Sequence, residues 1–286
     1  MKKIAVINDL SGFGRCSLTA AISTISVMGV QPCPFPTAVL SAQTGYKDSY
    51  CVELTDKMPL FQSSWEKMQA SFDGIYTGFA INEQQIQHMI DFVEAFQKKG
   101  TFFLADPIMG DHGKRFDIFT PLFCEKMREL AKRADIITPN ITELCILTGT
   151  DYRIIENIAE EKELITTVHQ IASEFQKEGP QSIVVTGIQF QDEQTGENKI
   201  GNLAIQGKDT YMSSFPYIGG SYSGTGDLFA SIIAGGIARG KKLEELIDLA
   251  GAFIEKAITD AVAAGIPRDE GVEYERYLYF IGDVVK

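Results

Sequence analysis

The sequence predicts an α/β protein whose mainly parallel central sheet is covered by helices on both faces. Short β-branched runs such as residues 4–7 (IAVI) and 182–187 (SIVVTG) alternate with longer segments of helical periodicity. Such alternation is typical of βαβ units, which place helices on both faces of a parallel sheet. No linker, internal repeat or low-complexity segment divides the sequence, so we expect a single domain over residues 1–286.

The first half of the chain supplies four expected strands and four expected helices. Gly29 and Gly100 each follow a segment of helical periodicity and act as stop signals. The expected strands are residues 4–7, 31–40 (extended, with prolines), 74–78 and 101–106, and the expected helices are residues 15–28, 61–71, 83–98 and 119–133.

The second half continues the alternation. Residues 134–140 form a strand that Pro139 ends, residues 182–187 form a buried strand, and residues 207–208 turn a hairpin between 198–206 and 209–215. The expected helices are residues 142–148, 163–178, 225–239 and 243–264, followed by a short terminal element of undetermined type at 273–282. Ligands of open α/β sheets bind beyond the carboxyl ends of strands, so we expect the site in the segments that follow the strands.

Charge and cysteine usage restrict the class of protein. With 26 Lys and Arg against 38 Asp and Glu, the net charge of −12 repels phosphate backbones, so we expect no nucleic-acid partner. The five scattered cysteines include no C-x-x-C pair, which agrees with a reducing cytoplasm and indicates no zinc site. No uncharged apolar run reaches the ~20 residues that cross a bilayer, and the N-terminus lacks a secretory signal, so we expect no membrane partner.

Two segments partly match nucleotide-binding motifs. Residues 235–241 (GGIARGK) fit G-x-x-x-x-G-K, but Lys242 replaces the magnesium-binding Ser or Thr and a helix precedes the segment, so we expect a packed helix that Gly240 ends. Residues 10–14 (LSGFG) begin a dinucleotide fingerprint, but Ser17 replaces its third glycine and no ribose-binding acid follows. A dinucleotide-binding oxidoreductase is therefore a disfavoured alternative. A non-catalytic nucleotide-binding protein is a further alternative, and the presence of Asp227 argues against it.

Residues 223–227 (SGTGD) stand directly before a predicted helix. Glycines at a helix N-terminus leave backbone N–H groups uncovered, and together with the helix dipole these groups form a site for an anion. Asp227 has two interpretations. Either it caps the helix, or it takes a proton from a substrate hydroxyl while the N–H groups hold a transferring phosphoryl group.

Two further strand ends carry polar side chains. Asp106 ends a predicted strand within residues 105–111 (ADPIMGD), and Asn140 ends another within residues 138–144 (TPNITEL). Asn140 and Glu143 form either the capping box of the next helix or part of a magnesium site. A magnesium site is built from few carboxylates, retained waters and nucleotide phosphates.

With these segments in this order, the chain resembles the ribokinase-like superfamily and, within it, the pyridoxal (vitamin B6) kinases. The segments that carry the resemblance are LSAQTGY (40–46), ADPIMGD (105–111), TPNITEL (138–144), VTG (185–187) and SGTGDLF (223–229). The resemblance covers nearly the whole chain and implies a three-layer ribokinase-like fold. It also implies ATP-dependent phosphorylation of the 5′-hydroxymethyl group of pyridoxal, pyridoxine or pyridoxamine.

The resemblance implies roles for single residues. Asp227 is the expected general base, and the N–H groups of Gly224, Thr225 and Gly226 are the expected anion hole. The residues expected to hold ATP phosphates and Mg²⁺ are Asp106, Asn140, Glu143, Thr186 and Gly187, with Asp106 and Glu143 as metal ligands. The residues expected to bind the vitamer are Asp9, Ser11, Thr44 and Phe79, although Asp9 is also explained as the cap of the turn that it begins.

The resemblance further implies a monovalent cation such as K⁺ and a homodimer. Residues 111–115 (DHGKR) are expected either to form a lid in which Lys114 or Arg115 touches phosphate, or to carry only solvated charges. Residues 8–12 (NDLSG) stand where many pyridoxal kinases carry a Ser-His pair, and Phe79 stands where a tyrosine is common. Because the turn after the first strand is similar to that of hydroxymethylpyrimidine kinases of thiamin synthesis, such a kinase is the alternative.

Overall fold

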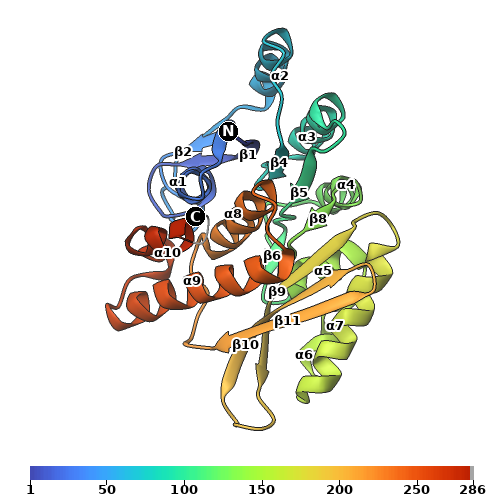
Figure 1. Ribbon diagram of the computed structural model, residues 1–286, viewed down its shortest axis with the longest axis vertical. Coiled ribbons are helices and arrows are strands. Elements are labelled where there is room, and N and C mark those ends of the chain that lie inside the picture. The colour runs from blue at the N-terminus through green and yellow to red at the C-terminus, as the bar shows by residue number, and fades with distance from the viewer. Residues whose placement is uncertain (284–286) are drawn as a thin grey trace. The chain divides into compact units, whose positions relative to one another are not determined.

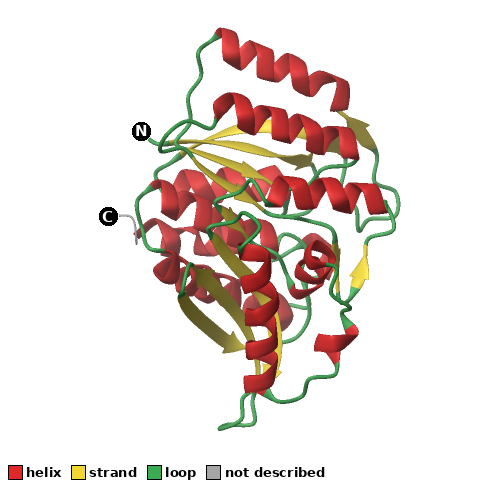
Figure 2. Cartoon of the chain, turned by 90° about the vertical axis from the view of Figure 1, so that its right-hand side faces the viewer, coloured by secondary structure: helices red, strands yellow, loops and turns green. Residues whose placement is uncertain are grey.

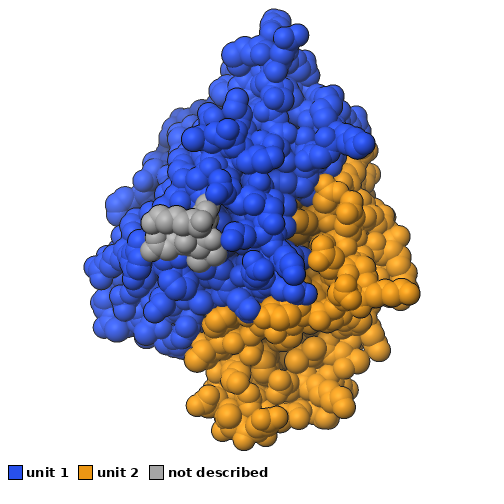
Figure 3. Space-filling model, viewed as in Figure 1, with its two compact units in different colours: residues 1–103, 218–286 blue, residues 104–217 orange. Residues whose placement is uncertain are grey.

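The computed structural model describes residues 1–283, and the chain divides into two compact units (Figure 3). Unit 1 consists of residues 1–103 together with the chain from residue 218 onward, and unit 2 consists of residues 104–217. Each unit contains both helices and strands and has its own buried core. Figure 2 shows the helices and strands along the chain. The prediction of one domain over the whole chain stays a prediction.

Unit 1 is built on four strands in the order β4-β1-β2-β3, in which β1 is parallel to both β2 and β4 and β3 is an antiparallel edge strand. Figure 1 labels β1, β2 and β4. The strands are β1 (Lys3–Ser11), β2 (Gln31–Leu40), β3 (Cys51–Glu53) and β4 (Gly74–Thr77). The helices are α1 (Ser17–Val27), α2 (Met58–Lys67), α3 (Glu83–Phe96), α8 (Thr225–Ala238), α9 (Leu243–Ala263) and α10 (Leu278–Asp283).

The two faces of β2 are packed by different helices. Phe35 of β2 makes edge contacts with Phe61 and Trp65 of α2 and with Phe92 of α3, at ring-centroid distances of 5.6, 5.4 and 5.1 Å. Helix α1 packs against β1 and β2 and also against α8. These contacts give unit 1 helices on both sides of its strands.

Unit 2 contains the strand order β5-β8-β9-β10-β11, parallel from β5 to β9 and antiparallel from β9 to β11. Helices α5 and α7 pack on β9. The strands are β5 (Phe102–Ala105, which begins in unit 1), β8 (Ile136–Ile137), β9 (Ser182–Gln191), β10 (Asn198–Gln206), β11 (Asp209–Pro216) and the hairpin β6 (Gly110–Asp111) with β7 (Lys114–Arg115). The helices are α4 (Pro121–Ala131), α5 (Ile141–Thr148), α6 (Arg153–Glu156) and α7 (Glu161–Gln176).

The predicted α/β class with a mainly parallel sheet is confirmed, and most element boundaries agree within a few residues. The packed-helix interpretation of residues 235–241 is also confirmed. Gly235 and Gly236 lie inside α8, where a Cβ atom would come within 2.8 Å of Met28 Sδ and 2.0 Å of Leu246 Cδ2. Gly240 follows the helix with φ of +76°.

Several boundaries were wrong for identifiable reasons. The helix expected at 61–71 begins at Met58, because Pro59 is favoured in a first helical turn, and it ends at Lys67. The strand expected at 134–140 shrinks to two paired residues, because Pro139 has no N–H for the sheet. Residues 111–115, expected as a loop that forms a lid or carries solvated charges, belong to the β6–β7 hairpin. The terminal element at 273–282, whose type the sequence left undetermined, is helical from Tyr274 onward (Tyr274–Tyr277 as a 3₁₀ turn, then α10).

The first strand is longer than the apolar run that predicted it. Strand β1 continues through Ser11, because its parallel pairing with β2 persists as far as the partners Ser11 and Leu40. Asp9 therefore lies within a strand and does not begin a turn. Among the described residues, no helix combines the length and the apolar composition needed to span a bilayer.

Candidate active site

Asp227 occupies the first turn of α8 in unit 1 and is 9% exposed. Asn8 Nδ2 donates a hydrogen bond to Asp227 Oδ1 at 3.0 Å, and the backbone N–H of Ser17 donates to the same carboxylate. Burial raises the pKa of Asp227 to about 6, and the charge on Asp9 adds to the rise, although the two hydrogen bonds lower the pKa. A carboxylate of this pKa is ionised at neutral pH and basic enough to assist proton removal from a hydroxyl.

The backbone at the start of α8 is held open by Gly224. This residue has φ of +84° and provides no side-chain cap, and a Cβ atom on it would lie 1.9 Å from the carbonyl oxygen of Arg15. Within the described part of the chain, the N–H groups of Gly224 and Gly226 have no hydrogen-bond partner, whereas the N–H of Thr225 lies 3.4 Å from Tyr222 O. Two of the three N–H groups predicted to form the anion hole are therefore open.

Three of the four predicted vitamer-binding residues gather near Asp227. Ser11 Oγ donates to Asp9 Oδ2 at 2.8 Å, and both residues are buried in β1. Phe79 is buried directly after β4. Burial raises the pKa of Asp9, while hydrogen bonds from the Ser17 and Ser11 side chains lower it. The fourth residue, Thr44, is exposed on the loop between β2 and β3, and no hydrogen bond among the described residues joins it to this group.

Sequence reasoning missed two residues of this cluster. Asn8 is completely buried and touches Asp227, yet only its place beside Asp9 near the end of the first strand hinted at a role. Ser17 begins α1 with φ of +51°, a left-handed conformation that is uncommon for a residue with a side chain. Its neighbour Cys16 is not a reactive thiol, because burial, together with the charges on Asp227 and Asp9, raises its pKa to about 12.

In unit 2, Asn140 and Glu143 form the capping box at the start of α5. Asn140 Oδ1 accepts the Glu143 N–H at 2.9 Å, and Glu143 Oε2 accepts the Asn140 N–H at 2.9 Å. The same two side chains bind the segment after β5, since Glu143 Oε1 accepts the Met109 N–H at 3.1 Å and Asn140 Nδ2 donates to Gly110 O at 2.9 Å. The capping-box interpretation is thus confirmed, and these residues also order residues 109–110.

Asp106 and Glu143 are two buried carboxylates that interact. Burial raises the pKa of Glu143 well above its ordinary value, and the charge on Asp106 raises it further. Asp106 also accepts a hydrogen bond from Thr138 Oγ1 at 2.9 Å. The described residues contain no cluster of three or more His, Cys, Asp or Glu suited to a metal, but Mg²⁺ needs only one or two carboxylates besides water and phosphate. The carboxylates of Asp106 and Glu143 are hard oxygen donors that repel each other, and a divalent cation would offset this repulsion. The two residues therefore fit Mg²⁺.

Thr186 and Gly187 lie in β9 next to Asn140. Thr186 N–H donates to Pro139 O at 2.9 Å, and Thr186 pairs with Asn140 in an isolated parallel bridge. Gly187 has φ of +71°, and a Cβ atom on it would meet no atom within 4 Å. Gly187 and Asn140 line a cavity of about 180 Å³ together with Asp111, His112, Ile141, Thr142, Tyr152, Ile155, Glu156, Ile158, Leu164 and Gln189.

The β6–β7 hairpin is fixed at its tip. Gly113 N–H donates to Thr142 Oγ1 at 2.8 Å, and a Cβ atom on Gly113 would lie 2.6 Å from the ring of Tyr152. Lys114 and Arg115 are exposed. The structure therefore shows an ordered hairpin with exposed cations, and the role of residues 111–115 as a lid stays a prediction.

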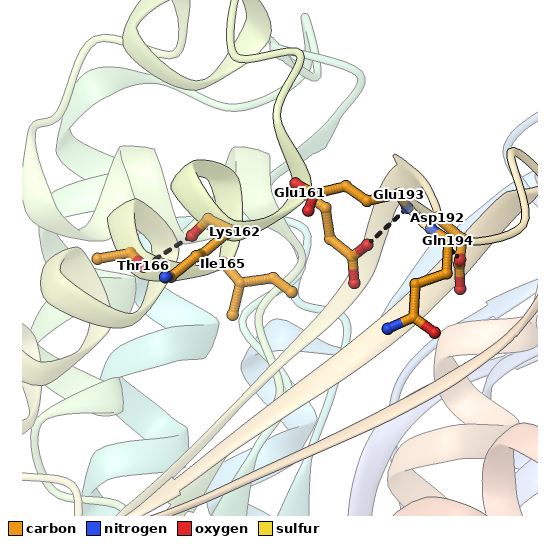
Figure 4. Close-up of a pocket in the computed structure, with 7 residues that line it drawn as sticks. All are labelled: Glu161, Lys162, Ile165, Thr166, Asp192, Glu193 and Gln194. Atoms are coloured by element: carbon orange, nitrogen blue, oxygen red, sulfur yellow. Dashed lines mark hydrogen bonds between the residues drawn. The ribbon is translucent and has the colours of Figure 1, made fainter.

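A larger cavity of unit 2, about 390 Å³, lies between the start of α7 and the β9–β10 turn (Figure 4). Three of its lining residues are acidic, Glu161, Asp192 and Glu193, and Glu161 accepts the Glu193 N–H at 3.2 Å. It contains none of the predicted site residues, and its acidic lining does not suit a phosphate.

A buried carboxylate at the open N-terminus of a helix places a base beside an electrostatic cradle, which is the arrangement that phosphoryl transfer requires. Residues 14–271 match the model of the phosphomethylpyrimidine kinase family, and the chain belongs to this family. The resemblance inferred from the motifs is thereby confirmed, and a dinucleotide-binding oxidoreductase loses its support.

Three known proteins show how far the likeness extends. A candidate pyridoxal kinase of Caenorhabditis elegans is 30% identical over 167 residues, which cover 57% of this chain but only 48% of the nematode protein. The crystal structure of a candidate phosphomethylpyrimidine kinase of Bacteroides thetaiotaomicron with pyridoxal has a TM-score of 0.89 at 34% identity, covering 98% of this chain and 95% of that one. Pyridoxal kinase of Lactobacillus plantarum has a TM-score of 0.85 at 25% identity, covering 99% and 98%. The three-layer α/β fold is thus confirmed.

Proposed function

We propose that this protein transfers the γ-phosphoryl group of ATP to the 5′-hydroxymethyl group of pyridoxal, pyridoxine or pyridoxamine. The observation that carries the proposal is the buried Asp227 carboxylate, with a pKa of about 6, in the helix turn where the N–H groups of Gly224 and Gly226 are open. Asp227 takes the hydroxyl proton, and the N–H groups with the helix dipole hold the negative charge of the transferring group. Family membership supports this assignment.

The remaining roles follow the same proposal. Asn140, Thr186 and Gly187 contact the ATP phosphates, and Asp106 and Glu143 hold Mg²⁺, which when bound would offset the phosphate charge. Asp9, Ser11, Thr44 and Phe79 bind the vitamer. We also infer a monovalent cation and a homodimer from the family resemblance, and a cytoplasmic location from the scattered cysteines.

Phosphorylation of hydroxymethylpyrimidine is the second candidate function, and the family that matches the chain favours it directly. The buried Asp9 carboxylate, which Ser11 Oγ orients, is compatible with both substrates. A protonated pyridine ring and an aminopyrimidine both present N–H donors to such an acceptor.

The direct test measures ATP consumption with pyridoxal, pyridoxine, pyridoxamine and hydroxymethylpyrimidine, each against a reaction without acceptor. We expect phosphate transfer to at least one B6 vitamer, with the product identified by mass spectrometry. Transfer to hydroxymethylpyrimidine alone would replace the first candidate by the second. No transfer to any of the four would contradict both.

Glu143→Gln is expected to raise the Mg²⁺ concentration required for half-maximal activity about tenfold, because the metal loses a charged oxygen donor. The control is Thr120→Ala, which removes the hydroxyl that accepts the Phe123 N–H at the start of α4 and so costs a helix cap in the same unit. Titrating Mg²⁺ at fixed ATP in both variants distinguishes the loss of a metal ligand from the loss of a helix cap. An unchanged Mg²⁺ requirement in Glu143→Gln would leave this residue with the capping role only.

A further inference from the structure

We infer that Asn8 is a positioning residue, whose single buried amide fixes the base Asp227 relative to the backbone of two residues proposed to bind the vitamer. The inference rests on the proposed function, since it assigns Asn8 to the same reaction. Asn8 lies in β1, Asp227 lies 219 residues later in α8, and Asn8 is completely buried. It is a part of the site that the motifs did not reveal.

The three hydrogen bonds of the Asn8 side-chain amide agree on one orientation of its oxygen and nitrogen. Its Oδ1 accepts the N–H of Phe79 at 2.8 Å and the N–H of Asp9 at 3.0 Å, so the oxygen must face these two donors. The amide nitrogen then faces Asp227 and donates to Oδ1 at 3.0 Å. One side chain thus connects the base with the backbone of two residues proposed to bind the vitamer.

Gly78 leaves the space in which this amide lies. Gly78 follows β4, where its N–H donates to Ile7 O at 2.9 Å, so its backbone is fixed beside β1. A Cβ atom on Gly78 would lie 2.5 Å from Asn8 Nδ2 and 2.8 Å from Asn8 Cγ. Any other residue at position 78 would have to displace the amide from Asp227.

The amide also sets the charge state of the base. Asp9 on β1 and the Cys16 thiol before α1 are the titratable groups that interact with Asp227, and the charge on Asp9 opposes ionisation of Asp227. The Asn8 N–H and the Ser17 N–H favour ionisation, because each donates to the carboxylate. Removal of the Asn8 donor therefore moves the pKa of Asp227 upward. As the pH is lowered, a variant without this donor loses activity at a higher pH than the wild type does.

Asn8→Asp is the sharpest test, because the two side chains have the same shape. Aspartate still accepts the N–H groups of Asp9 and Phe79, but it replaces the donor by a second carboxylate facing Asp227. We expect the acidic limb of the kcat profile to move up by about one pH unit or more, with kcat at pH 7 lowered by about ten- to a hundredfold. The KM for ATP should stay within about twofold, since Asn8 does not touch the nucleotide residues proposed above.

Gly78→Ala tests the same contact without adding charge. The new Cβ atom should push the amide from Asp227 and move the acidic limb in the same direction. The matched control is Asn82→Asp, since Asn82 caps α3 by accepting the Gln85 N–H at 3.0 Å and donates to Glu53 Oε2 at 3.3 Å. This control also loses a donor to a carboxylate, and its pH profile should equal that of the wild type.

The pH titration of the Asp227 carboxyl carbon by NMR, in protein without substrate, makes the result independent of turnover. We expect a midpoint near 6 in the wild type and a higher midpoint in Gly78→Ala and Asn8→Asp. Unchanged midpoints and pH profiles in these two folded variants would overturn the positioning role. If the wild type phosphorylates none of the four acceptors, the proposed function fails, whereas the NMR midpoints still decide the role of Asn8.

Discussion

Asp227→Asn is expected to lower kcat by at least ~100-fold, the usual contribution of a general base, while ATP and vitamer still bind. The substitution keeps the shape of the side chain and its acceptor for the Asn8 N–H at 3.0 Å, but it removes the basic oxygen. Steady-state turnover, together with calorimetric titration of both ligands, measures the two parts of this prediction. Near-normal turnover would exclude Asp227 as the base.

The same variant is expected to be more stable than the wild type at pH 8. The pKa of Asp227 is raised from 3.8 to about 6 in the folded protein, so the folded state favours the neutral form. Stability is therefore greatest below the unfolded pKa and falls as the pH rises through the interval between the two values. The loss is on the order of 3 kcal/mol, and the uncharged amide of Asp227→Asn avoids it.

Urea unfolding at pH 4.5 and pH 8 measures this effect, with Asp209→Asn as the control. Asp209 is an exposed carboxylate at the start of β11, so this control changes the same charge without relieving burial. We expect Asp227→Asn to be stabilised relative to the wild type at pH 8 and much less so at pH 4.5. A stability difference that does not change with pH would contradict the raised pKa.

Gly224→Ala is expected to destabilise the protein by about 3 kcal/mol or more and to lower kcat/KM by at least ~100-fold. Alanine at φ of +84° costs roughly 1–2 kcal/mol from backbone strain. Its Cβ atom would also lie 1.9 Å from Arg15 O and 2.9 Å from Cys16 Cα, so the loop must move from the backbone that precedes α1. That movement displaces the open N–H groups at the start of α8, which hold the transferring charge.

Gly149→Ala is the control that distinguishes the effect of backbone strain in Gly224→Ala from the effect of its clash with Arg15. Gly149 ends α5 with φ of +73°, and a Cβ atom on it would meet nothing within 4 Å. This control should lose only the roughly 1–2 kcal/mol of left-handed strain and keep its kinetics. Equal stability losses and wild-type kinetics in both variants would show that the Gly224 backbone does not need its close packing against Arg15.

How much of the site could be predicted differs from residue to residue. Asn140 and Glu143 were recognised with both of their interpretations, because a capping box depends on residues three apart. The start of α8 and the position of Asp227 followed from the glycines of SGTGD for the same reason. The length of β1 was underestimated, because its end is decided by pairing with β2 and has no signal of its own in the apolar run.

The sequence by itself determined the α/β class, the order of the longer strands and helices, and the segments that carry the polar strand ends. These properties depend on periodicity, glycine and proline, which act over a few neighbouring residues. Only the tertiary structure decided that Asn8 donates to Asp227, that Gly78 makes room for it, and that Asp106 and Glu143 are buried together. The physical reason is that such contacts join residues far apart in the chain, whose meeting is set by strand pairing and helix packing.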